Sequence, residues 1–288
     1  MRCYPECYTC MLRQALAAGR QAGAPEPQQH QIVQQVLTIL QRSDPSESPS
    51  EIAHYTNRAV REVTGVLDPY LAFKTACTQR ALQMVPRLTR LLAEAADPLE
   101  IAVRLAIAGN IIDAVHTYDH DLEATVEKTL SQPLAGNGVD TLREALGRAS
   151  RVLYLADNAG ETVFDRLLIE RLGKSVIYAV KGSPILNDAT FADALAAGVD
   201  RVAQIVSTGA DGPGTALRFC TDEFRRLYDA ADLIVVKGQA NYETSDDLDG
   251  RLFFMLQIKC AVLGRHLGFP FGSVVLQGGD RASPAAVE

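Results

Sequence analysis

The sequence lacks long apolar runs. None approaches the roughly 20 residues that a membrane-spanning helix needs. The first residues, MRCYPECYTCMLRQ, also lack the apolar core of a secretory signal peptide. Tryptophan is absent, but the composition is otherwise that of an ordinary globular protein. We therefore expect a globular protein of the cytoplasm, without a membrane partner.

Basic runs are missing as well, and the formal net charge is −7. Without basic residues interleaved with aromatic ones, a broad surface for nucleic acid or an anionic membrane is disfavoured. A small anionic ligand would need local positive charge, from a metal ion and one or two lysines. The patterns G-x-x-x-x-G-K-[ST] and, after the first strand, G-x-G-x-x-G are also absent, which disfavours a P-loop and a dinucleotide-binding fold.

The hydrophobic pattern of the sequence changes near residue 148. Before it, periodic apolar positions punctuated by proline and serine predict helices. After it, short β-type runs alternate with predicted helices at 162–172, 189–197, 215–229 and 260–267. The runs are RVLYLA, SVIYAV, RVAQIV, DLIVVKG, FFMLQI and SVVLQ. This alternation predicts an α/β fold with a doubly wound, mostly parallel sheet. We predict an all-helical domain at 1–148, an α/β domain binding metal and phosphate at 149–280, and a disordered tail at 281–288.

Polar residues follow each β-type run, where the carboxyl ends of parallel strands form one ligand-binding edge. Asp157 and Asn158 follow the first run, and Asp188 comes after the second. Carboxylate and amide oxygens form a hard ligand set that suits Mg²⁺ or Mn²⁺ held partly by water. Each residue alone also suits ordinary turn or helix-cap chemistry. The convergence of several such loops on one edge favours a functional site.

Further candidate substrate contacts share this edge. They are Glu161, Lys181, Thr208, Asp211, Lys237, Asn241, Tyr242 and Lys259. The lysines can neutralise phosphate charge, and the glycine-rich loop STGADGPGT, leading into the predicted helix at 215–229, can offer backbone N–H groups to an anion. Lys259 is flanked by core-type residues, and burying an unpaired charge is costly. We therefore expect Lys259 to emerge at the sheet edge, facing the phosphate.

Two further sites have open interpretations. Asn110 and Asp113, on one face of a predicted helix, form either a helix–helix contact or a wall of the active site. Cys3, Cys7 and Cys10 have the C-x₃-C-x₂-C spacing of radical-SAM enzymes, but they open a predicted helix at Met11–Gly19 and no (β/α) barrel follows. Cys7 and Cys10 can instead hold a second metal, undergo redox chemistry, or be buried structural thiols.

Several motifs resemble a known family. LYLADNAGETVFDRLLIERL, KGSPILNDAT, STGADGPGT, VVKGQANYET and LQIKCAVLGRHLG are similar to the family once called domain of unknown function 89. Its members are metal-dependent damage-control phosphatases that share a metal-binding domain with protein-glutamate methyltransferase-like proteins. PECYTCMLRQAL, DPYLAFK and AIAGNIIDAV resemble the subgroup with an N-terminal Cys-x-x-Cys. The resemblance spans nearly the whole chain.

The resemblance implies a divalent metal on Asp157, Asn158 and Asp188. It also implies substrate contacts from the GQANYE segment and from Lys259, and it favours the active-site interpretation of the AIAGNIID helix. Relatives outside the subgroup have aspartate where Gln239 stands and arginine where Glu243 stands. Their sugar-phosphate specificity is therefore not carried over to this chain.

The predicted function is that of a metal-dependent phosphomonoester hydrolase, a phosphatase acting in metabolite damage control. Its substrate would be a sugar phosphate, a nucleotide or a phosphopantetheine-like compound, and its metal Mn²⁺, Mg²⁺, Co²⁺ or Ni²⁺. One alternative is a SAM-dependent carboxyl methyltransferase, although VLYLADNAGE has only Gly160 where that fold needs more glycine. The other is a non-catalytic metabolite-binding module. The native metal, the attacking group and the oligomeric state stay open.

Overall fold

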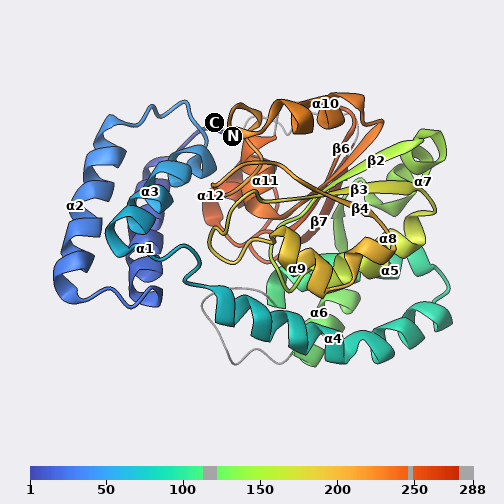
Figure 1. The fold of residues 1–288 in the computed structure, drawn as a ribbon. Coiled ribbons are helices and arrows are strands. Elements are labelled where there is room, and N and C mark those ends of the chain that lie inside the picture. Colours follow the sequence, from blue (N-terminus) through green and yellow to red (C-terminus); the bar gives the residue numbers. More distant parts are fainter. Residues whose placement is uncertain (113–121, 246–248, 279–288) are drawn as a thin grey trace.

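The computed structural model describes residues 1–112, 122–245 and 249–278, so Asp113 and the predicted tail at 281–288 lie outside the described residues. A seven-stranded sheet with helices on both faces stands beside a bundle of three helices (Figure 1). The strands are β1 (Leu134–Gly136), β2 (Arg151–Leu155), β3 (Ser175–Val180), β4 (Gln204–Ser207), β5 (Leu233–Lys237), β6 (Leu252–Gln257) and β7 (Val274–Gly278). The α/β fold and the helical N-terminal region are confirmed.

The strands lie in the order β1-β7-β6-β5-β2-β3-β4. From β6 to β4 all neighbours are parallel, whereas β7 runs antiparallel to β6 and β1 runs parallel to β7. The chain leaves β2 toward β3 on one side and returns to β5 on the other. The strand order therefore reverses between β2 and β5, and such a switch point opens a crevice at the carboxyl ends of the strands.

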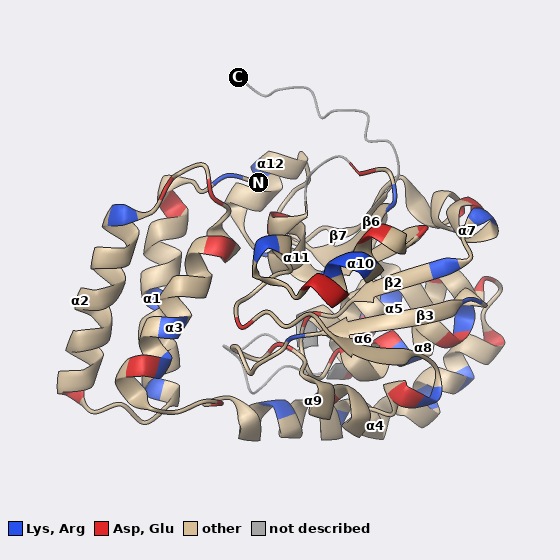
Figure 2. Ribbon diagram, turned by 45° about the horizontal axis from the view of Figure 1, so that its top comes forward, with Lys and Arg blue, Asp and Glu red and all other residues tan. Residues whose placement is uncertain are grey.

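Helices cover the sheet on both faces. They are α4 (Leu71–Glu94), α5 (Pro98–Ile112), α6 (Leu122–Ser131), α7 (Gly138–Arg148), α8 (Thr162–Leu172) and α9 (Phe191–Ala196) in one layer, and α10 (Asp222–Ala230), α11 (Gly238–Thr244) and α12 (Ala261–Leu267) in the other. Because both faces are covered, β2 and β5 are almost continuously apolar and buried. Figure 2 accordingly shows charged residues mainly on helices and loops rather than along the strands.

The three-helix bundle consists of α1 (Pro5–Gln21), α2 (Glu26–Arg42) and α3 (Pro49–Thr64). Its apolar core includes Val262 of α12, so the bundle packs against the α/β part. A capping box starts α3, because Ser48 accepts from the backbone of Glu51 while Glu51 accepts from the backbone of Ser48. At the same end of α3, Arg218 from the 3₁₀ turn after β4 pairs with Glu47 and Glu51.

Some elements differ from the sequence-based expectation. β1 was not predicted, because three residues carry little pattern, and α10 begins at Asp222 rather than continuing from residue 215. The glycine-rich loop is therefore separated from the N-terminus of α10 by a 3₁₀ turn at Leu217–Phe219. α1 begins at Pro5, so Cys7 and Cys10 lie within the helix. The domain boundary at residue 148 stays a prediction. β1 and α5 precede this boundary in the chain, yet β1 is a strand of the sheet and α5 packs on the sheet.

Within the described part of the chain, every helix is too short or too polar to cross a membrane.

Candidate active site

The loops after β2 and β3 are tied together by their backbones. Asn158 and Asp188 pair through an isolated antiparallel bridge, and the N–H of Ala189 donates to the carbonyl of Asp157 at 2.7 Å. These contacts follow from the parallel pairing of β2 with β3, which brings both loops to the same edge. The three residues predicted as metal ligands are therefore next to one another.

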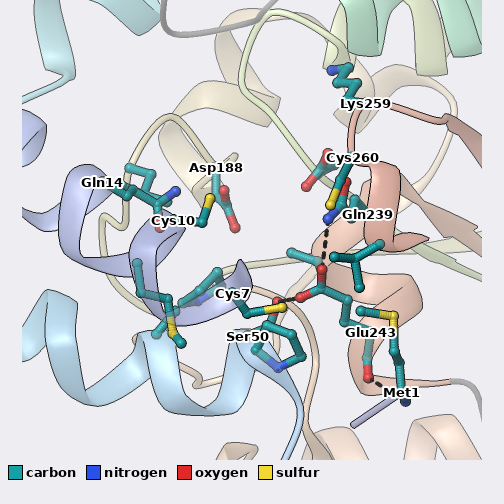
Figure 3. A pocket seen from close by; sticks show the side chains of 18 of the residues that line it. Met1, Cys7, Cys10, Gln14, Ser50, Asp188, Gln239, Glu243, Lys259 and Cys260 are labelled. Atoms are coloured by element: carbon teal, nitrogen blue, oxygen red, sulfur yellow. Dashed lines mark hydrogen bonds between the residues drawn. The ribbon is translucent and has the colours of Figure 1, made fainter. Parts of the chain in front are cut away.

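A cavity of about 310 Å³ lies at this edge, between the bundle and the sheet. One part of its lining, here called the sheet-edge wall, consists of Asn110, Asp157, Asn158, Asp188 and Lys259. Another part, here called the Glu243 wall, consists of Cys7, Ser50, Gln239 and Glu243. Figure 3 shows Lys259 at one end of the cavity, Glu243 with Ser50 toward the other, and Asp188 beside Cys10 at one side. The cavity thus joins residues of α1, α3, α5 and α11 to the strand ends.

The sheet-edge wall carries more buried negative charge than its neighbours balance. Burial, together with the charges of Glu161 and Asp188, raises the pKa of Asp157 well above its usual range. Burial also raises the pKa of Asp188 to about 6, although Lys181 acts in the opposite direction. Both carboxyl groups would hold their charge more easily beside an added cation.

The donor set fits a hard divalent cation. The buried Oδ2 of Asp188 has no hydrogen-bond partner among the described residues, and the Nζ of Lys181 lies 3.6 Å from it. The side-chain nitrogen of Asn158 donates to Glu161 at 2.5 Å and to Asp157 at 3.1 Å, which turns its amide oxygen away from these carboxylates. Two carboxylates and an amide oxygen are ligands that Mg²⁺ and Mn²⁺ accept. The residues present therefore fit the implied metal.

Gly238 allows the close approach of β5 to Asp157. It has a φ of 75°, and a Cβ at this position would lie 1.9 Å from the Oδ2 of Asp157. Only glycine meets both demands without displacing the carboxylate. Nearby, Leu186 has a φ of 47°, a conformation that is costly for a residue with a side chain, and it lines the same cavity. The backbone around the candidate ligands is thus held in a specific conformation.

A buried ion-pair network lies behind the sheet-edge wall. The fully buried Nζ of Lys237 donates to Glu161 at 2.9 Å and to Asp165 at 2.7 Å. Burial alone would lower the pKa of Lys237, but these two carboxylates raise it above its usual value. Tyr154 and Tyr178 donate to Asp165 at 2.6 and 2.7 Å. Lys237 therefore supports Glu161 from inside the fold, and it does not line the cavity.

Helix α5 connects this network to the cavity. The side chain of Asn110 donates to Asp157 at 2.7 Å and to Glu161 at 2.6 Å. The Nζ of Lys259 donates to the main-chain oxygen of Asn110, and the side chain of Lys259 is exposed and lines the cavity. Glu161 is completely buried and does not line it. Of the predicted substrate contacts, Asn110 and Lys259 thus reach the cavity, while Glu161 orients its neighbours.

The structure places Asn241 and Tyr242 inside the fold. Asn241 donates to the carbonyls of Ala156 and Lys237 at 2.9 and 2.8 Å, which joins the ends of β2 and β5. The buried ring of Tyr242 packs against Phe254, with the centroids 4.9 Å apart. Neither residue lines the cavity. Both hold the crevice between the two strands in shape.

Lys181, Thr208 and Asp211 also lie outside the lining. Lys181 donates to the carbonyl of Gly214, and Thr208 accepts from the backbone of Ala210 at 3.2 Å. Asp211 forms an ion pair with Arg61 of α3 at 2.9 Å. These contacts organise the glycine-rich loop after β4, and Asp211 fastens it to the bundle.

Ser50 was not found from the sequence. It donates to Glu243 at 2.7 Å although the two residues are 193 positions apart, and no local pattern marks such a contact. Gln239 and Glu243 were noted only as departures from relatives, and both line the cavity. A signal was available in GQANYE, because a carboxylate one helical turn after a polar residue at a strand end shares its helix face.

The cysteines give limited support to a second metal. Cys7 and Cys10 line the cavity, and all six cysteines are free thiols. The hydrogen bond from Cys3 lowers the pKa of Cys7 to about 7, while burial acts in the opposite direction. Across residues 1–112, 122–245 and 249–278, no group of three or more His, Cys, Asp or Glu side chains could hold a metal, and the set at Asp157 contains only two such residues.

Comparison with known proteins identifies relatives along the whole chain. The model of the damage-control phosphatase ARMT1-like domain matches residues 3–275. A damage-control phosphatase of Pyrococcus horikoshii is 32% identical over 96% of this chain and 97% of its own, and one of Archaeoglobus fulgidus is 31% identical over 96% and 98%. A crystal structure of a DUF89 family protein from P. horikoshii superposes with a TM-score of 0.89 at 31% identity, over 97% of this chain and 100% of that chain.

Proposed function

Because the chain belongs to the damage-control phosphatase ARMT1-like domain family, we propose that it is a metal-dependent phosphatase of a small phosphorylated metabolite. The observation that carries the proposal is the buried pair Asp157 and Asp188 at the switch point, with one oxygen of Asp188 lacking a hydrogen-bond partner among the described residues. The names of the two archaeal relatives support hydrolysis of a phosphate ester. A damage-control role in the cytoplasm is part of this proposal.

Asp157, Asn158 and Asp188 would hold the divalent cation. When bound, it supplies Lewis acidity toward a phosphoryl oxygen and makes a water molecule more acidic. The chain contributes the positions of these ligands, because Gly238, Asn110 and the backbone bridge fix the two carboxylates.

Lys259 would stabilise the negative charge on the phosphoryl group. Its Nζ is held at the carbonyl of Asn110, at the mouth of the crevice, and a lysine is a compact donor with no acceptor to compete. Charge that develops on the phosphoryl oxygens is stabilised most by donors that are already in place. Residues of α1 and α3 line the same cavity, so the bundle would shape the space around the reacting group.

The methyltransferase alternative is less well supported. A glycine-rich first motif is needed for close approach of SAM. The turn after β2 instead carries two buried carboxylates, Asp157 and Glu161, and both accept a hydrogen bond from the side chain of Asn110. Binding of isotope-labelled SAM tests this alternative directly, and saturable binding at micromolar concentration would favour it over hydrolysis.

The test of the phosphatase proposal is phosphate release from metal-stripped protein. A panel of sugar phosphates, nucleotides and phosphopantetheine is assayed with Mn²⁺, Mg²⁺, Co²⁺ or Ni²⁺ added singly. We expect release only with added metal, and a loss of at least about 100-fold in Asp157→Ala, since even residues that only orient a ligand cost 10–100-fold. Asp229→Ala, at an exposed position of α10, is the control. Metal-independent release, or unchanged turnover in Asp157→Ala, would contradict the proposal.

A further inference from the structure

The Glu243 wall contains a buried carboxylate in a fixed orientation. Glu243 of α11 is 6% exposed. Its Oε2 accepts from the hydroxyl of Ser50 at 2.7 Å, and its Oε1 accepts from the side-chain amide of Gln239 at 2.7 Å. Both bonds are drawn in Figure 3. Because the donors come from α3 and α11, the carboxylate is held from two separate elements.

This carboxylate retains capacity to bind a ligand. The two oxygens of an ionised carboxylate offer about four lone-pair positions. Ser50 and Gln239 occupy one position on each oxygen, and Glu243 lines the cavity. Burial raises the pKa of Glu243, whereas the hydrogen bonds from Ser50 and Gln239 and the positive charge of the Met1 α-amino group lower it. A hydroxyl or ammonium group of a ligand in the cavity can therefore donate to Glu243.

In the described part of the chain, two cationic groups belong to residues that line the cavity, the ammonium group of Lys259 and the α-amino group of Met1. Among the described residues, Lys259 is the one lysine or arginine whose side chain lines the cavity, and it belongs to the sheet-edge wall. The α-amino group of Met1 donates to the main-chain oxygen of Glu243 at 3.1 Å, on the far side of that residue from Lys259 (Figure 3). The Met1 α-amino group is bound to the main chain of Glu243, and no lysine or arginine side chain of the described residues lines the cavity beside the Glu243 carboxylate. A second anionic group on a ligand would therefore meet this carboxylate directly.

We propose that Glu243 selects the leaving alcohol of the substrate. The alcohol carries hydrogen-bond donors, hydroxyl or ammonium, and lacks a second anionic group. Selection works in both directions, because a donor gains a hydrogen bond to a desolvated carboxylate, whereas an anion meets a like charge. This inference rests on the proposed phosphatase function and narrows its substrate class. The inference excludes bisphosphates and phosphorylated acids as good substrates.

The test uses two phosphomonoesters of similar size, glycerol phosphate and phosphoglycerate. They share the phosphate and the three-carbon chain, and they differ in a terminal hydroxymethyl or carboxylate group. With Mn²⁺ at about pH 8, we expect the wild-type kcat/KM to favour glycerol phosphate by at least about tenfold. Glu243→Gln should narrow the ratio to below about threefold, mainly by raising the rate on phosphoglycerate, because it removes the like charge and keeps the shape.

Two further variants separate charge from packing. Glu223→Gln, at an exposed position of α10, removes the same charge elsewhere and should leave the ratio unchanged. Ser50→Ala keeps the charge of Glu243 but releases one oxygen, so it should still disfavour phosphoglycerate. Equal wild-type rates on the two esters would overturn the inference, and so would an unchanged ratio in Glu243→Gln.

Failure of the proposed function is distinguishable from failure of this inference. If the wild-type protein releases phosphate from neither ester and from no member of the larger panel, the phosphatase proposal fails. The same two compounds are then titrated calorimetrically into the protein in Mn²⁺. Tighter binding of glycerol phosphate, with the difference lost in Glu243→Gln, supports the selection by Glu243. Equal dissociation constants overturn it.

Discussion

The metal-ligand candidates of the sheet-edge wall come from loops that follow the neighbouring parallel strands β2 and β3, whereas the Glu243 wall joins segments as distant as Ser50 and Glu243. In the first wall the backbone pairing of β2 with β3 brings the acidic side chains together. In the second, the packing of the bundle on the α/β part does so. The proposed metal site therefore rests on strand pairing within the sheet, whereas the proposed selection by Glu243 depends on how the bundle packs against it.

A second contrast lies within the lysines that follow the strands. Lys237 is completely buried and paired with two carboxylates, whereas Lys259 is exposed at the mouth of the cavity. The same residue type at the same edge therefore contributes to stability in one place, and is proposed to act on the ligand in the other.

The largest effect is expected for Lys237→Met. The change removes the cation from Glu161 and Asp165 and leaves two buried carboxylates without their partner. We expect a loss of about 3–5 kcal/mol in the free energy of unfolding, measured by urea denaturation. Lys128→Met, at an exposed position of α6, is the control. A loss below about 1 kcal/mol would mean that the network adds little to stability.

Lys259→Met should instead change the kinetics and leave the stability nearly unchanged. The apolar stem is kept and the exposed charge is deleted, so the free energy of unfolding should change by less than about 0.5 kcal/mol. Transition-state stabilisation should fall by roughly 2–4 kcal/mol, measured as kcat/KM for phosphate release. Metal affinity should stay nearly unchanged. Unaltered kinetics with a shifted thermal midpoint would show that Lys259 is structural.

Gly238→Ala tests the close contact with Asp157. A Cβ costs roughly 1–2 kcal/mol in the left-handed region, and here it would also displace the carboxylate. Gly173→Ala is a matched control, since Gly173 has a φ of 63° and no atom within 4 Å of the added Cβ. We expect a loss of stability in both variants, larger in Gly238→Ala because of the collision, and a fall in Mn²⁺ affinity of about tenfold only in Gly238→Ala. Equal affinities would argue against Asp157 as a ligand.

The smallest effect concerns pH and the metal-free protein. Burial raises the pKa of Asp188 to about 6, so the protonated form stabilises the fold at low pH, and this stability is lost as the pH rises through about 6. The midpoint temperature of thermal unfolding should therefore decrease as the pH is raised from 4 to 7, by roughly 2–4 °C for each kcal/mol of stability lost. Added Mn²⁺ should reverse the trend, because it binds the ionised carboxylates. Asp188→Asn should weaken both effects.

The secondary structure of the α/β part follows closely from the sequence. The helix expected at 162–172 is α8 with the same bounds, and each β-type run overlaps a strand. Apolar runs bounded by turn residues are local signals, and β2 and β5 are buried on both faces, which makes those signals strong. β1, with three residues, has no such signal.

Side-chain direction was less predictable than position. Lys237 was placed correctly at the carboxyl end of β5, yet its side chain turns to α5 and α8 rather than to the cavity. Successive side chains along a strand point to opposite faces, so a shift of one residue reverses the assignment. The sequence therefore shows which residue stands at the sheet edge, but not toward which face of the sheet its side chain points.

By itself, the sequence determined the order of helices and strands and the gathering of Asp157, Asn158 and Asp188 at one sheet edge. Local propensity and the parallel pairing of neighbouring strands are enough for that. The tertiary structure alone decided that Lys237 is a buried partner of Glu161, that Gly238 touches Asp157, and that Ser50 reaches Glu243. Such contacts depend on the packing of whole elements against one another, and packing between distant segments leaves no periodic trace in the chain.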